Sequence, residues 1–194
     1  MKIVFKISFA AAALALTLAG AARPARADQV YFTPRDLLAD FFRSSKNVTY
    51  KKVELDSAEK LRLQHRLGYT PSKASYTFYV ATSAGGHVDG YAFIDEEKGE
   101  HLPITFAVKL SPEGKVMRQE IVVYREARGD EVRDEKFRAQ FVGKSARDAI
   151  ETDQDIQVVS GATISSRAMA VGVKRAVVLF DELVKPTAVA TASR

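Results

Sequence analysis

Hydrophobic and polar residues alternate along the middle of the chain in the way that is typical of β-strands. Four runs rich in aromatic and β-branched residues occur at 76–81, 88–94, 104–110 and 116–124. Gly85-Gly86 separates the first two runs, and residues 111–115, which contain a Pro and a Gly, separate the last two. Since short turns join antiparallel neighbours, this pattern predicts an antiparallel meander.

Apolar residues at helical spacing flank this middle region. The pattern predicts helices after Thr33, from Asp56 or Ser57 to Gly68, over 134–141, and from Ser165 or Ser166 to about Val184, with a further strand at 48–55. Thr33-Pro34 is a start signal and Gly68 a stop signal. The last stretch has a broad apolar face that should pack on the sheet. Helices against an antiparallel sheet predict a single-domain α+β fold.

The first 27 residues have the pattern of a secretory signal peptide. Lys2 and Lys6 precede an apolar run over residues 7–19, and Ala25-Arg26-Ala27 has the small-x-small pattern of a cleavage site. The apolar run is shorter than the roughly 20 residues that a membrane-spanning helix needs. We therefore expect cleavage after Ala27 and a periplasmic location, with an uncleaved anchor as the alternative.

Charge and cysteine content exclude several classes of protein. The chain carries a formal net charge of +5, but residues 1–27 hold four of its basic residues and no acidic one, which leaves +1 for the rest. A nearly neutral chain gives no reason to expect nucleic acid as a partner. Because there is no cysteine, disulfides, thiolate-ligated iron–sulfur clusters and c-type haem attachment are excluded. His65 and His87 have no partner at metal-ligand spacing, so no metal site is expected.

The segment that carries the most chemistry runs from Val159 to Ser166 and reads Val-Ser-Gly-Ala-Thr-Ile-Ser-Ser. It lies where the last predicted helix begins, and a helix N-terminus offers free N–H groups and a partial positive charge to a phosphate. The hydroxyl of Thr163 is placed to attack a phosphorus atom there. The alternative is an ordinary loop with a Ser or Thr cap, which is common. No general base or nucleophile set stands out, so no catalytic residue is expected.

Three segments together resemble the FMN-binding domain family: residues 99–105, 124–132 and 160–166. That family includes the periplasmic flavoprotein subunits of the Rnf complex and of the sodium-pumping NADH:quinone oxidoreductase. The resemblance extends over residues 76–176. Together with the signal-peptide pattern and the lack of an apolar period after residue 185, it predicts four parts. These are a signal peptide (1–27), an N-terminal helix and strand extension (28–75), an FMN-binding domain (76–185) and a disordered tail (186–194).

Residues 160–166 look like the flavinylation motif of this family, in which a Mg²⁺-dependent flavin transferase cleaves FAD and joins the FMN phosphate to a threonine. The resemblance therefore implies FMN as the cofactor and a phosphoester at Thr163. The other cofactor-binding residues implied in this motif are Ser160, Gly161, Ala162, Ser165 and Ser166. The two small residues would leave space for the transferase and the phosphate, while the last two serines would bind the phosphate or cap the helix.

The chain departs from the family at one position before the motif. The family often has an acidic residue three positions before the serine of the motif, where this chain has Gln157, with Asp155 two residues earlier.

Residues 124–132 resemble the Glu-Thr-Pro-Gly stretch that lies near the flavin ring in the family. Glu126 and Gly129 match it, whereas Ala127 and Arg128 replace the Thr and Pro. The resemblance implies that Glu126 and the backbone around Gly129 border the isoalloxazine. A solvated turn of charged residues is the alternative.

Five aromatic residues of the predicted sheet could stack on a flavin: Tyr76, Phe78, Tyr79, Tyr91 and Phe93. Their period-two spacing favours a place in the core instead.

These observations predict an exported flavoprotein that relays electrons between a membrane redox partner and a periplasmic acceptor after maturation by a flavin transferase. The alternatives are a non-covalent FMN-binding module and an FMN-dependent reductase of an unknown small substrate. An electron-transfer flavoprotein is favoured over a stand-alone enzyme.

Overall fold

The computed structural model describes residues 28–185, so the predicted signal peptide and the predicted tail lie outside the described residues. One antiparallel sheet has the spatial strand order β1-β6-β5-β4-β3-β2. Its strands are β1 (Gln29–Val30), β2 (Asn47–Glu54), β3 (Ser75–Thr82), β4 (Val88–Lys98), β5 (Pro103–Leu110) and β6 (Val116–Tyr124). The predicted meander is therefore confirmed as β3 to β6, and the short β1, which the pattern did not predict, pairs with β6 at the edge.

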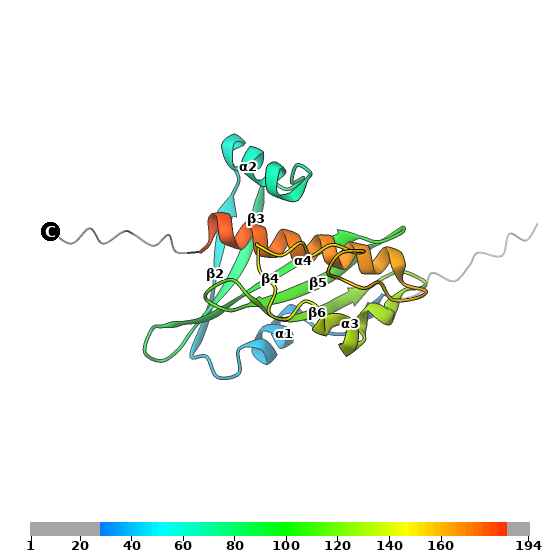
Figure 1. The fold of residues 1–194 in the computed structure, drawn as a ribbon. Helices are drawn as coiled ribbons and strands as arrows, with labels where there is room; N and C mark the ends of the chain where they lie inside the picture. The colour runs from blue at the N-terminus through cyan, green and yellow to red at the C-terminus, as the bar shows by residue number, and fades with distance from the viewer. Residues whose placement is uncertain (1–27, 186–194) are drawn as a thin grey trace, which may run out of the picture.

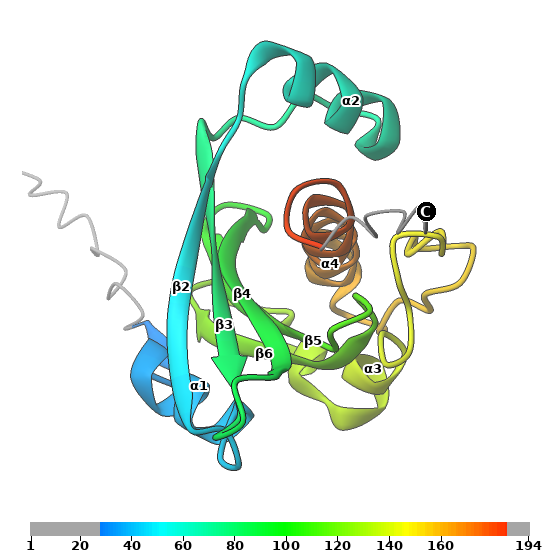
Figure 2. The ribbon, with the colours of Figure 1, turned by 90° about the vertical axis from the view of Figure 1, so that its left-hand side faces the viewer.

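Helices cover both faces of the sheet. They are α1 (Pro34–Phe41), α2 (Ser57–Leu67), the short 3₁₀ helix η1 (Asp130–Arg133), α3 (Glu135–Ala139) and α4 (Thr163–Leu183). The concave face of the sheet curves around α4, and α1 lies against the convex face. α2 lies next to the carboxyl-terminal half of α4 (Figure 1, Figure 2). This arrangement confirms the α+β fold in a single domain. Within residues 28–185, no helix is both long enough and apolar enough to cross a membrane.

Local signals explain where α1 and α2 begin and end. The Thr33 hydroxyl accepts a hydrogen bond from the N–H of Asp36 at 3.2 Å. Asp56 and Glu59 form a reciprocal capping box, with N···O distances of 2.7 and 2.9 Å. Gly68 ends α2 in the left-handed conformation, with φ of +78°.

Two predicted helix boundaries were wrong. The helix expected over 134–141 is the shorter α3, preceded by η1. It ends at Ala139 because the N–H groups of the next three residues bind carbonyls three positions earlier, as in turns. The last helix begins at Thr163, before either serine that was expected to cap it.

The main core lies between α4 and the concave face of the sheet. Tyr76, Phe78, Tyr91 and Phe93 belong to it, and Phe180 of α4 packs edge-on against the ring of Tyr91 with centroids 4.7 Å apart. On the opposite face, Tyr79 packs in a second cluster under α1. The interpretation as core is therefore confirmed for Tyr76, Phe78, Tyr91 and Phe93, whereas Tyr79 is partly buried at the edge of the second cluster.

A buried guanidinium fixes α4 to the end of β4. Arg175 Nη2 lies 3.0 Å from Asp95 Oδ2 and donates to the carbonyl of Glu96 at 2.9 Å, and Arg175 also pairs with Glu97. Burial by itself would lower the pKa of Arg175, but the two carboxylates outweigh it and raise the pKa above its usual value. The guanidinium therefore stays charged, and it holds α4 beside the turn that follows β4.

The backbone of α4 approaches the sheet most closely at Gly172. A Cβ atom there would lie 2.6 Å from Cζ of Phe106, a fully buried ring on β5. Only glycine leaves room for this ring against the helix.

We expect Gly172→Ala to lower the free energy of unfolding by about 1 kcal/mol, and by no more than about 2 kcal/mol, measured by urea denaturation. Overpacking costs about 1–3 kcal/mol, and the better helix propensity of Ala offsets about 1 kcal/mol of it. Val171→Ala, on the exposed side of the same helix, is the control and should change stability by less than about 0.5 kcal/mol. Unchanged or increased stability of Gly172→Ala would show that the ring can move aside at no cost.

Candidate functional site

The first turn of α4 is open to solvent and lacks a side-chain cap. Gly161 has φ of +83°, and Ala162 occupies the N-cap position with no side-chain hydrogen bond to the helix. Thr163, the first helical residue, is exposed. The N–H groups of such a turn and the positive end of the helix dipole favour an anion. The chemistry of this helix end therefore fits a phosphate.

The hydroxyls of Ser165 and Ser166 bind other groups of the protein instead of capping the helix, so their predicted capping role was wrong. Ser166 is fully buried, and its hydroxyl donates to the carbonyl of Ala162 at 2.8 Å and accepts from the N–H of Val159 at 3.1 Å. Because a hydroxyl has one proton, Ser166 cannot also donate to a phosphate. It fixes the loop that leads to Thr163.

Ser165 meets the end of β6. Its Oγ lies 2.8 Å from the hydroxyl of Tyr124, which also donates to the carbonyl of Arg128. Burial is the main cause that raises the pKa of Tyr124 to about 12, so its phenol is protonated at neutral pH. This hydroxyl joins the loop after β6 to the first turn of α4.

Gly129 allows the loop to approach the helix so closely. Its φ is +92°, and a Cβ atom would lie 2.5 Å from Ser165 Oγ and 2.7 Å from Tyr124 Oη. Both the backbone conformation and the space therefore require glycine at this position.

Glu126 is buried with only 6% of its surface exposed, so the alternative of a solvated charged turn is wrong for this residue. Its Oε1 accepts hydrogen bonds from the N–H groups of His101 and Leu102, at 2.6 and 2.8 Å. Gly99 lies so close that a Cβ atom there would be 2.6 Å from the same oxygen. The carboxylate therefore ties residues 99–102 to the loop after β6.

These pieces enclose a cavity of about 240 Å³. It is lined by Glu100, Glu126, Arg128, Gly129, Gly161, Ala162, Thr163, Ile164 and Ser165. A second hollow of about 320 Å³ shares Glu100, Glu126 and Arg128 with it and adds His101 and Ala127. All three segments that carry the family resemblance thus meet around one cavity.

Most of the predicted cofactor-binding residues lie at this cavity, but two do not line it. Ser160 is exposed in the preceding loop, and Ser166 is buried behind the first turn. Sequence reasoning missed Tyr124, because its position at the end of an alternating strand resembles that of any core aromatic residue.

The loop before Thr163 is held by side chains from elsewhere in the chain. The amide of Gln140 both accepts from the N–H of Gln157 at 2.7 Å and donates to its carbonyl at 3.1 Å. The carboxylate of Asp155 pairs with Lys144 at 2.7 Å and accepts from the N–H of Ile150 at 3.1 Å. Asp155 is therefore engaged within the loop and does not replace the acidic residue that the family often has at position 157.

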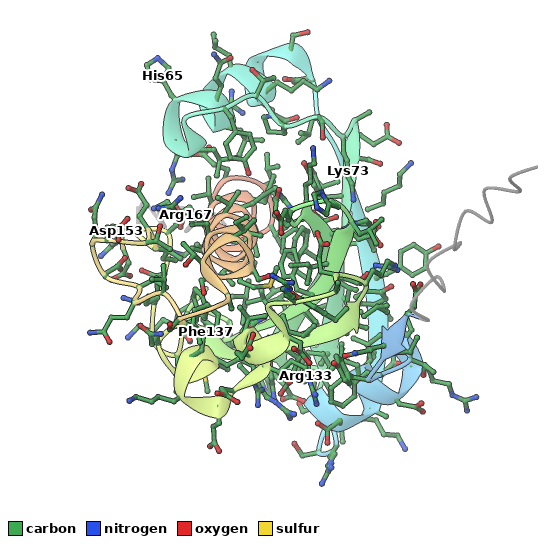
Figure 3. The ribbon with its side chains drawn as sticks, turned by 90° about the vertical axis from the view of Figure 1, so that its right-hand side faces the viewer. His65, Lys73, Arg133, Phe137, Asp153 and Arg167 are labelled. Carbon is green, nitrogen blue, oxygen red and sulfur yellow. The ribbon has the colours of Figure 1, made fainter. Side chains whose placement is uncertain are left out.

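The other charged residues near this loop lie at the surface. Asp153 and Arg167 approach each other to 3.8 Å, and His65 points outward from α2 (Figure 3). Among residues 28–185, no group of three or more His, Asp or Glu side chains could hold a metal ion.

The residues around this cavity lie in a part of the chain that is similar to known proteins. The model of the FMN-binding domain family matches residues 99–178. This part of the chain is an FMN-binding domain. The match confirms the predicted family resemblance and the predicted cofactor, FMN, and it spans every residue that lines the cavity.

Two individual proteins are also similar to the chain. One is a subunit of the proton-translocating ferredoxin:NAD(+) oxidoreductase complex of Clostridium ljungdahlii, 36% identical over 107 residues, which are 51% of this chain and 57% of that protein. The chain thus spans little more than half of that relative. The crystal structure of Shewanella oneidensis NqrC matches with a TM-score of 0.46 and 18% identity, over 72% of this chain and 80% of that one.

We expect Glu126→Ala to loosen residues 99–102 and to lower the free energy of unfolding by about 2–4 kcal/mol, because it removes two hydrogen bonds to a charged acceptor. Hydrogen exchange should accelerate at the amides of His101 and Leu102.

Glu126→Gln is the matched control, since it keeps one acceptor oxygen in the same place. It should retain most of the protection from exchange. Equal protection of both amides in Glu126→Ala and in the wild-type chain would contradict the tethering role of this carboxylate.

Proposed function

We propose that this FMN-binding domain carries FMN as a phosphoester on Thr163 and relays electrons between a membrane redox partner and a periplasmic acceptor. The observation that carries the proposal is the position of Thr163. It is exposed, it is the first residue of an uncapped helix, and it lines the cavity within the family match.

Attachment requires an accessible hydroxyl and an accessible phosphate site. The Thr163 oxygen attacks the FMN phosphorus of FAD, a bond forms between that oxygen and phosphorus, and the pyrophosphate bond breaks. AMP leaves, and the hydroxyl proton is lost to solvent or to the flavin transferase. The phosphodiester keeps one negative charge, which the dipole of α4 stabilises by about 0.3–1 kcal/mol.

The remaining wall of the cavity is suited to the rest of the cofactor. The loop over 126–129, tied down by Glu126 and Tyr124, would border the isoalloxazine, with residues 99–102 on its other side. Bound FMN supplies the electron chemistry. The chain supplies attachment, orientation and the charges of Glu100, Glu126 and Arg128 around the cavity.

The Clostridium ljungdahlii relative is named as part of an oxidoreductase complex that uses ferredoxin and NAD(+). This supports a membrane electron-transfer complex as the partner. Maturation of the chain by a flavin transferase is part of the proposal. Cleavage after Ala27 and a periplasmic location complete the proposal.

The ester is tested by co-expression with a flavin transferase. The wild-type chain should keep flavin fluorescence on a denaturing gel and gain the mass of one FMN minus water. Thr163→Ala should lose both signals completely, because the two serines that follow in the helix are at most 4% exposed and their hydroxyls are already hydrogen-bonded within the protein. Thr163→Ser should retain part of the modification, since it keeps the attacking oxygen.

Thr152→Ala is the matched control, a threonine of the preceding loop that does not line the cavity, and it should be modified like the wild type. Flavin that binds but is released entirely by acid precipitation would favour a non-covalent FMN-binding module instead. Undiminished covalent flavin in Thr163→Ala would contradict the assignment of the acceptor.

Export is tested separately. Amino-terminal sequencing of the chain from a periplasmic fraction should begin at Asp28. An intact Met1, or residues 1–27 retained with the chain in the membrane fraction, would contradict cleavage.

A further inference from the structure

Three polar groups lie in line along one wall of the cavity. The carbonyl of Arg128 accepts from the hydroxyl of Tyr124, and Ser165 Oγ lies 2.8 Å from that same hydroxyl. Tyr124 is 1% exposed and Ser165 is 4% exposed, and Ser165 lines the cavity. Water therefore does not compete for most of these bonds.

Counting protons fixes the direction of each bond. A carbonyl oxygen can only accept, so the Tyr124 hydroxyl gives its single proton to Arg128. The bond between Tyr124 and Ser165 then needs a proton from Ser165. Ser165 has no proton left for a ligand, so its oxygen can only accept a hydrogen bond from one.

This polarity decides what Ser165 can bind. A phosphodiester oxygen carries negative charge and also only accepts hydrogen bonds, so it would be repelled by Ser165 Oγ. A neutral O–H donor would be favoured. The sequence-based expectation that Ser165 binds the phosphate is therefore at odds with its hydrogen bonds.

We propose, resting on the ester at Thr163, that Ser165 Oγ accepts a hydrogen bond from a hydroxyl of the ribityl chain of FMN. Tyr124 is the positioning residue that sets this polarity. Thr163 and Ser165 line the same cavity only two residues apart. The part of the cofactor nearest to Ser165 is thus the part next to the phosphate, and the ribityl chain is the hydroxyl-bearing part there.

The test is a thermodynamic cycle on the full mature chain. Wild type and Ser165→Ala are each prepared with and without the flavin ester, by co-expression with or without a flavin transferase, and intact mass establishes the loading. Urea unfolding then gives four equilibrium constants. Because the ester stays on the unfolded chain, the effect of flavin on each constant reports only contacts made in the folded state.

We expect flavin to stabilise the folded wild-type chain by about three- to tenfold more than it stabilises Ser165→Ala, the range of one neutral hydrogen bond. Ser165→Cys, which is close to serine in size but has a weak acceptor, should show the same reduced stabilisation by flavin. It replaces Ser165→Ala in the cycle if the alanine variant does not fold. Tyr124→Phe should also remove most of the factor. Tyr91→Phe, a buried tyrosine of β4 away from the cavity, should leave it unchanged.

Equal effects of flavin in wild type and in both Ser165 variants would overturn the proposed bond, because a purely structural serine changes loaded and unloaded chains alike. If flavin stabilises Tyr124→Phe as strongly as it stabilises the wild type, the positioning role of Tyr124 is overturned, but the bond to Ser165 is not. A wild-type chain that gains no flavin mass would instead contradict the ester itself, so the two failures are distinguishable.

Discussion

The packing of α4 into the concave face of the sheet is the contact that positions every other part of the site. Gly172 lets the helix backbone lie against Phe106, and Arg175 binds the carboxylates at the end of β4. Both contacts are on the buried side of the helix. Together they set how far the first turn of α4 extends beyond the sheet, and so where Thr163 lies relative to the loops after β4 and β6.

Two kinds of polar group lie within a few residues of each other at the start of α4, beside the cavity. The first turn offers free N–H groups and the positive end of a dipole, which suit an anion. Two residues further into the helix, the hydroxyl of Ser165, whose proton is already used, can only accept a hydrogen bond, which suits a donor. A ligand that is anionic at one end and rich in hydroxyl groups next to it matches this order.

Sequence reasoning succeeded where one local interaction dominates. Asp56 at the start and the left-handed Gly68 at the end mark the two boundaries of α2 by local interactions, and both were predicted from the sequence. Alternation of the aromatic residues predicted their burial, since period two places them on one face of a strand. Reasoning from residue type failed for Ser165 and Ser166, because a serine at a helix start is often a cap. Here Ser165 binds Tyr124 at the end of β6, and Ser166 binds the loop that leads to Thr163.

Short-range patterns in the amino-acid order were enough to predict the antiparallel meander, the burial of most of its aromatic residues and the family whose model matches residues 99–178. Such patterns depend on neighbours within a few positions. The burial of Glu126 and the hydrogen bond between Tyr124 and Ser165 became visible only in the folded chain. The physical reason is that the direction of a hydrogen bond depends on every partner in its network, and Tyr124 and Ser165 are 41 residues apart.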